Sequence, residues 1–193
     1  MVAFSQQEKR FKTGDLLAWS VRGWGNTTDA VSQVIRAVLR SEYCHVGNAL
    51  VIDGMAFVVE ALPPAIRLYP LDKLTPFYHI QIPTEGIYKY QPYALDYENE
   101  LFSASKRSAQ RFLLDVIGEE YSRIQAVMSL FDTPPRDNKW QCAELANAFY
   151  REMGLDLGET YTPSAIVEAA LNIIDTDGNP VCMSLVTPDT KLR

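Results

Sequence analysis

Cys142 is the residue of this chain with the clearest capacity for covalent chemistry. The stretch DNKWQCAELANAFYREMG (137–154) predicts a helix, and the apolar stripe along that helix begins at Cys142. The unpaired N–H groups at a helix N-terminus favour an anion, so they stabilise a thiolate and can donate to an oxyanion formed in acyl transfer. Two interpretations stay open from the helix alone: a nucleophile, or a buried cysteine that only packs. A base near the thiol would favour the nucleophile.

A predicted β-hairpin supplies a base and a group to orient it. Asp53-Gly54 joins two β-rich runs and is a strong signal for a two-residue turn. With that turn, alternation places His45 and Glu60 on one face of the hairpin as diagonal neighbours. The imidazole can take the thiol proton of Cys142, and the carboxylate can fix the imidazole tautomer. A satisfied core histidine is the alternative for His45, whereas Glu60 between apolar residues requires a partner when buried.

The elements that must position these residues indicate an α+β fold. Strands are expected over 11–20, on both sides of Asp53-Gly54, over 77–82 and over 181–186, and helices over 28–40, 103–117, 122–131, 137–154 and 162–171. Asp137 or Asn138 is the expected cap of the cysteine helix. The stretch 84–99, rich in Tyr and Pro, is expected to be a connecting loop. Three small residues on the His45 face are expected to let the cysteine helix approach closely: Gly47, Ala49 and Ala56.

The composition favours one compact domain. A chain of 193 residues with 47% hydrophobic and 22% charged residues is ordinary for a globular protein, so we expect a single domain over 1–193. The net charge of −6 argues against nucleic-acid binding, which needs a basic surface. Three cysteines and two histidines, without a CxxC or HExxH motif, indicate neither a disulfide scaffold nor structural zinc. We therefore expect no metal and no cofactor.

The sequence also predicts a location. No apolar run reaches the roughly 18 residues of a membrane-spanning helix, so we expect no transmembrane segment. The N-terminal stretch MVAFSQQEKRFKTGD lacks the pattern of a secretory signal. Together these observations predict a cytoplasmic protein, and the oligomeric state is left open.

Four short motifs follow one another in an informative order. They are GDLLAW (14–19), CHVGNAL (44–50), VVEA (58–61) and QCAELANAFYREMGL (141–155). They resemble the permuted branch of the NlpC/P60 papain-like superfamily, the group of the YiiX-like proteins. In the standard family the cysteine helix precedes the other three motifs, whereas here it follows them. The resemblance covers about residues 11 to 170 and implies a circularly permuted papain-like fold, with a small antiparallel sheet or barrel packed against helices.

The resemblance implies a catalytic triad. Cys142 would be the nucleophile, His45 the general base and acid, and Glu60 the orienting residue of a thiol-dependent hydrolase. Its substrates would be amides of peptides, isopeptides or cell-wall peptides, or lipid-linked amides and esters, and the reaction would pass through an acyl-enzyme.

Several neighbouring residues receive structural interpretations beside this triad. Tyr43 is a candidate oxyanion donor, although a buried structural tyrosine is an equal alternative. Asp15 is interpreted as a turn residue. Cys182 and His79 match no motif and are interpreted as structural.

Two other functions stay open. One is a lipid acyltransferase or phospholipase of the lecithin:retinol acyltransferase type, also permuted; the QCAEL core departs from that family's asparagine-cysteine-glutamate core. The other is a non-enzymatic binding module on the same fold. It is less favoured because Cys142, His45 and Glu60 are all chemically competent residues.

Overall fold

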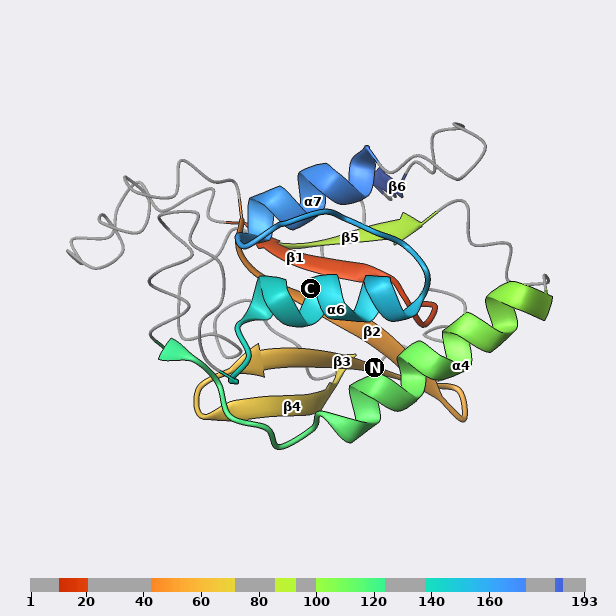
Figure 1. Ribbon diagram of the computed structural model, residues 1–193, viewed down its shortest axis with the longest axis horizontal. Coiled ribbons are helices and arrows are strands. Elements are labelled where there is room, and N and C mark those ends of the chain that lie inside the picture. Colours follow the sequence, from red (N-terminus) through yellow and green to blue (C-terminus); the bar gives the residue numbers. More distant parts are fainter. Residues whose placement is uncertain are drawn as a thin grey trace.

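One antiparallel sheet and three helices form the part of the chain that the computed structural model describes, residues 11–20, 43–71, 86–92, 100–123, 138–172 and 183–185 (Figure 1). The strands are β1 (Leu16–Ser20), β2 (Tyr43–Ile52), β3 (Met55–Leu62), β4 (Ala65–Pro70), β5 (Gly86–Pro92) and β6 (Met183–Leu185). The helices are α4 (Glu100–Asp115), α6 (Cys142–Glu152) and α7 (Pro163–Leu171). The strand order is β4-β3-β2-β1-β5-β6, and every neighbouring pair is antiparallel. The predicted α+β class is confirmed.

The β2–β3 hairpin has the register that its turn residues predict. Asp53 and Gly54 both adopt positive φ values, 46° and 77°, which the tight turns of two-residue hairpins require. Asn48 pairs with Val59 and Ala49 pairs with Val58. This pairing is the one on which the diagonal arrangement of His45 and Glu60 depends, so the predicted register is confirmed.

Alternation along the strands divides the buried side chains between two hydrophobic clusters. The first cluster joins strand residues such as Leu50 and Val59 to Leu145 and Phe149 of α6 and to residues of α4 and α7. The second cluster combines the other set of alternate strand positions with Phe11 before β1 and Leu71 after β4; its strand residues are Leu17, Trp19, Ala49, Ala56 and Val58. Figure 1 shows α6 crossing in front of the sheet over β2, and α7 contacts β1 and β2. The three helices therefore cover one face.

The GDL turn before β1 is anchored to two other elements. The Gly14 N–H donates to the Ala49 carbonyl at 3.1 Å, and the Ala49 N–H donates to the Asp15 carbonyl at 2.8 Å. The Asp15 carboxylate accepts the Lys12 N–H at 3.0 Å, which confirms its interpretation as a turn residue. The Tyr150 hydroxyl of α6 donates to the Gly14 carbonyl at 2.7 Å. This bond connects the cysteine helix to the start of β1.

Two local predictions are wrong. The predicted loop over 84–99 contains β5, whose residues 86–90 pair with β1. The cap of α6 is Gln141 rather than Asp137 or Asn138. The other predicted helices over 103–117 and 162–171 correspond to α4 and α7, and the predicted strand over 181–186 contains β6. The predictions for 28–40 and 77–82, and most of 122–131, lie outside the described residues.

Candidate active site

Cys142 is the first residue of α6, and the side chain of Gln141 caps that helix. The Gln141 Oε1 accepts the Ala143 N–H at 3.0 Å, and the Glu144 carboxylate accepts the Gln141 N–H at 3.4 Å. The Gln141 Nε2 donates to the Tyr161 carbonyl at 2.8 Å, which fixes the orientation of the amide. This reciprocal capping box ends the extended segment at residue 141 and places the Cys142 thiol in the first turn of α6. The sulfur therefore lies at the electropositive end of the helix, as predicted.

A short pairing between two segments leads the chain into α6. The Trp140 N–H donates to the Glu120 carbonyl at 3.0 Å, and the Ser122 N–H donates to the Trp140 carbonyl at 2.8 Å. Tyr121 forms a parallel bridge with Trp140. Burial and the charge of Cys142 raise the pKa of the Tyr121 phenol, so this hydroxyl stays protonated near the thiol.

A bulge in β2 lies next to His45. Trp19 pairs with His45 and Ser20 pairs with Tyr43, so Cys44 is an extra residue between the two pairs. A bulge bends its strand and changes the direction of nearby side chains. The indole ring of Trp19 lies against the imidazole of His45, with ring centroids 4.7 Å apart. The imidazole of His45 thus lies between the buried indole of Trp19 and the polar groups of Glu60 and Cys142.

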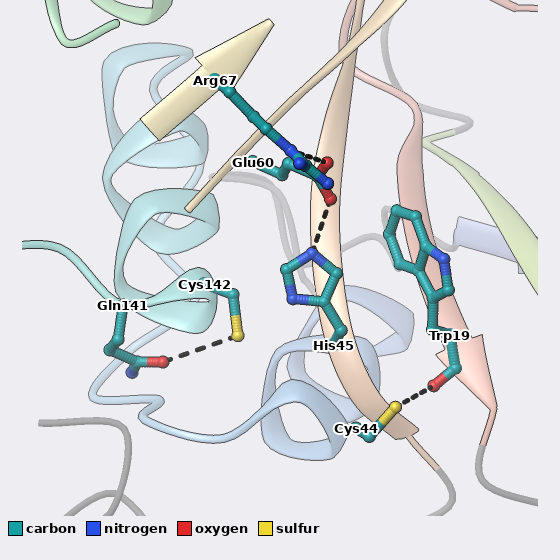
Figure 2. A network of polar contacts seen from close by, with 7 residues as sticks. All are labelled: Trp19, Cys44, His45, Glu60, Arg67, Gln141 and Cys142. Carbon is teal, nitrogen blue, oxygen red and sulfur yellow. Dashed lines mark hydrogen bonds and ion pairs between the residues drawn. The ribbon is translucent and has the colours of Figure 1, made fainter. Parts of the chain in front are cut away.

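The imidazole of His45 contacts a carboxylate on one side and faces the thiol on the other (Figure 2). His45 Nε2 lies 2.7 Å from Glu60 Oε2, and both side chains are buried. The second ring nitrogen, Nδ1, is on the side of the Cys142 sulfur. Cys142, His45 and Glu60, from three different elements, therefore come together in the order that nucleophile–base–orienter chemistry requires.

The second oxygen of Glu60 has a cationic partner that the sequence analysis missed. Arg67 Nε donates to Glu60 Oε1 at 3.0 Å, and the two residues face each other in the β3–β4 ladder. Glu60 is 0% exposed, whereas Arg67 is 38% exposed, so the guanidinium reaches from the sheet edge to the buried carboxylate. Pairing across a turn at Pro63-Pro64 could have revealed this contact, because it places position 67 opposite position 60.

Gly47 leaves the room that the His45–Glu60 contact needs. A Cβ atom at this position would lie 2.7 Å from Val58 Cγ2 and 3.2 Å from Glu60 Cβ. The prediction that Gly47, Ala49 and Ala56 admit the cysteine helix is wrong. Ala49 and Ala56 belong to the second cluster, whereas α6 packs in the first, and the atoms nearest to Gly47 belong to β3. Gly47 makes room for β3 instead.

The electrostatics of the site favour a charged imidazole. Burial alone lowers the pKa of His45, but the hydrogen bonds and charges of Cys142 and Glu60 outweigh it and raise the pKa of His45 to about 9. An imidazolium beside a carboxylate and a thiolate is the arrangement that activates a cysteine nucleophile. The site can therefore hold a proton on His45 at neutral pH.

Cys44 is a second thiol near the site but is not equivalent to Cys142. Its sulfur lies 3.5 Å from the Trp19 carbonyl. Burial and the charge of Cys142 raise the pKa of Cys44 to about 12, so its thiol stays protonated and unreactive. Tyr43, a candidate oxyanion donor, is buried in the first cluster, where its backbone N–H donates to Ser164 Oγ at 3.3 Å. Cys182 and His79 lie outside the described residues.

Two further properties concern the described residues as a whole. Within those ranges, no group of three or more His, Cys, Asp or Glu side chains is arranged to hold a metal ion. None of the helices placed there combines the length and apolar character needed to span a bilayer.

Comparison with known proteins supports a distant relationship at the level of fold. No family model matches the chain, and no curated protein matches it. Among solved structures, the chain is similar to the crystal structure of the metalloprotein yiiX from Escherichia coli O157:H7 (DUF1105), with a TM-score of 0.52 and 17% sequence identity. The match covers 92% of this chain and 89% of that one. A YiiX-like fold is therefore supported.

Proposed function

We propose that this protein is a cysteine hydrolase that cleaves amide bonds through Cys142, His45 and Glu60. The observation that carries the proposal is the buried His45–Glu60 contact of 2.7 Å beside a thiol in the first turn of α6. A histidine that only fills a core needs neither a thiol nor a helix N-terminus beside it. The order of the GDL, HVG, VEA and cysteine motifs supports a circularly permuted papain-like architecture within the NlpC/P60 superfamily, and the likeness to yiiX is consistent with it.

The first half of the proposed reaction forms an acyl-enzyme. In the resting structure the Cys142 thiol lies 3.7 Å from Gln141 Oε1 and faces the imidazole of His45. Transfer of the thiol proton to His45 Nδ1 leaves a thiolate, which attacks the carbonyl carbon of an amide. The negative charge moves to the carbonyl oxygen, where backbone N–H groups at the N-terminus of α6 can stabilise it. His45 then gives its proton to the amine nitrogen, the C–N bond breaks and a thioester to Cys142 remains.

The second half releases the acid and restores the site. His45, now neutral, takes a proton from a water molecule whose oxygen attacks the thioester carbonyl. Collapse of that intermediate breaks the C–S bond, and the proton returns from His45 to the Cys142 sulfur. Glu60 accepts the Nε2–H of His45 in both halves, so the ring keeps its orientation while Nδ1 exchanges the proton.

The donor set of this site does not match a catalytic metal centre, although yiiX is described as a metalloprotein. One nitrogen of His45 is occupied by Glu60, and the other Glu60 oxygen is occupied by Arg67. The described residues thus leave the Cys142 sulfur and His45 Nδ1 as donors, whereas catalytic zinc sites use three protein ligands. The proposed mechanism therefore uses the side chains alone.

Site-selective alkylation tests the proposal. Iodoacetamide at pH 7, followed by peptide mass spectrometry, should modify Cys142 at least about tenfold faster than Cys44, because His45 can take the proton of the Cys142 thiol whereas burial raises the pKa of Cys44. His45→Ala should remove this difference, and Glu60→Gln should reduce it. Equal rates at both cysteines, or a Cys142 rate that is unchanged in His45→Ala, would contradict the nucleophile assignment.

Turnover measurements then separate the enzyme classes. Cell-wall peptides, peptide and isopeptide amides, N-acyl amides and phospholipids should be incubated with the protein and with Cys142→Ala. Cleavage of an amide by the first and not by the second supports the proposed hydrolase. Cleavage of phospholipids alone would favour the lipid acyltransferase class, and no turnover despite a reactive Cys142 would favour a binding module.

A further inference from the structure

The geometry points to Arg67 as a positioning residue for the triad. It acts through Glu60, by keeping that buried carboxylate ionised and directed at His45 during the proton transfers. This inference rests on the proposed function and adds a fourth member to its site.

Three adjacent strands bring these groups into one row. His45 is on β2, Glu60 on β3 and Arg67 on the edge strand β4, where it is the direct cross-strand partner of Glu60. Each carboxylate oxygen has a different partner: Oε2 lies 2.7 Å from His45 Nε2, and Oε1 accepts from Arg67 Nε at 3.0 Å. Figure 2 shows the carboxylate between the imidazole and the guanidinium. Two contacts at two oxygens leave the carboxylate little freedom to rotate.

The ring of Tyr69 supports the guanidinium. Arg67 Cζ lies 5.4 Å from the centroid of this ring, within the range of a cation–π contact. The partly exposed Arg67 is thereby held along the edge strand with its Nε directed at Glu60. The sheet edge supplies a cation to a site whose other members are buried.

The charge balance of the proposed reaction explains why a cation is needed there. When Cys142 is a thiolate and His45 an imidazolium, these two charges compensate each other, and Arg67 compensates Glu60. When His45 has given its proton to the leaving group, the thioester and the imidazole are both neutral. Glu60 would then be an isolated buried anion, which is strongly unfavourable without a partner. Arg67 supplies that partner at every step, so Glu60 can orient the ring without taking its proton.

The sign of the expected effect follows from the groups around His45. Among the described residues, the charged or titratable groups that face it are Cys142 from α6 and Glu60 from β3, and Cys44 beside it on β2 stays neutral. Arg67 shares the Glu60 carboxylate with His45 and therefore opposes protonation of the imidazole. Loss of the Arg67 charge should raise the pKa of His45, whereas loss of the Glu60 charge should lower it. A purely structural contact predicts no such opposite pair of shifts.

Histidine NMR measures these pKa shifts of His45 without any substrate. The chain has two histidines, so His79→Gln assigns the signals, and Cys142→Ala removes the thiol that faces the imidazole. In that background, Arg67→Gln should raise the pKa of His45 by about one pH unit, a moderate shift because the guanidinium is partly screened. Glu60→Gln should lower it by about one unit or more. Arg67→Lys keeps the positive charge, so the pKa of His45 should stay within about 0.3 units of its value in the parent protein.

The possible outcomes separate this inference from the proposed function. An unchanged or lowered pKa of His45 in a folded Arg67→Gln variant would overturn the role of Arg67. If Arg67→Gln does not fold, Arg67→Lys decides, because a shift of more than about 0.5 units with the charge retained would overturn the charge argument. Opposite shifts without selective alkylation of Cys142 in the wild-type protein would support Arg67 and contradict the hydrolase. Selective alkylation of Cys142 without these pKa shifts of His45 would support the hydrolase and contradict the role of Arg67.

Discussion

Gly47→Ala is predicted to destabilise the fold and to separate Glu60 from His45. The new Cβ would lie 2.7 Å from Val58 Cγ2, 3.2 Å from Glu60 Cβ and 3.2 Å from the Val59 carbonyl oxygen. Ordinary carbon–carbon contacts are about 3.5–4.0 Å. Val58 is fully buried, so its methyl group cannot move into solvent. Relief must come mainly from a displacement of β3, which carries Glu60.

The magnitude follows from these distances. Widening the 2.7 Å contact to an ordinary one requires a displacement of roughly 0.8 Å. If Glu60 moves with its strand, the 2.7 Å contact with His45 lengthens to roughly 3.5 Å, beyond the useful range of a hydrogen bond. Overpacking of this kind costs about 1–3 kcal/mol, and a weakened hydrogen bond to a charged group adds about 1–2 kcal/mol. We expect the free energy of unfolding to fall by about 2–5 kcal/mol.

Urea unfolding and Cys142 alkylation together test this prediction. Gly118→Ala is a matched control, because φ at Gly118 is +92° and no atom would lie within 4 Å of the new Cβ. That variant should lose about 1 kcal/mol from backbone strain and keep its Cys142 alkylation rate. Gly47→Ala should lose more stability and also react several-fold more slowly at Cys142, because His45 is no longer oriented.

A double variant identifies the clash as the cause. Val58→Ala removes the methyl group that the new Cβ would meet, so its combination with Gly47→Ala should cost less than the sum of the two single changes. The difference should be about 1–2 kcal/mol, and the alkylation rate should recover in part. Additive losses would refute the steric argument, and an unchanged alkylation rate in Gly47→Ala would refute the claim that Gly47 makes room for the His45–Glu60 contact.

Three further predictions concern pH and the placement of α6. The pKa of His45 near 9 predicts that amide turnover, which uses the imidazolium as acid, declines above about pH 9; a pH–rate profile that falls near pH 6.5 instead would contradict it. Gln141→Ala removes the helix cap and should lower the unfolding free energy by about 1 kcal/mol, measured by urea unfolding, and an unchanged unfolding free energy would contradict the capping role. Tyr150→Phe leaves the buried Gly14 carbonyl without this donor and should cost about 1–2 kcal/mol, while a loss below about 0.3 kcal/mol would show that the bond does not anchor α6.

Local sequence patterns determined the parts of the site that depend on neighbouring residues along the chain. Asp53-Gly54 allows the positive φ values of a tight hairpin, and strand alternation then places His45 and Glu60 on one face. The apolar period of α6 likewise placed Cys142 at the helix start. These features follow from turn chemistry and from the two side-chain periods, both of which are local.

Only the tertiary structure decided the contacts between distant segments. β5 was mistaken for a loop because its partners, β1 and β6, are far away in the chain, and because Gly86 and Pro92 bound the short run of strand-favouring residues Ile87, Tyr88 and Tyr90. Gln141 caps α6 because the Tyr161 carbonyl, from the loop after the helix, holds its amide. The Cys142 thiol faces His45 because the first hydrophobic cluster packs α6 on β2. Such contacts depend on packing between elements, which no local periodicity encodes.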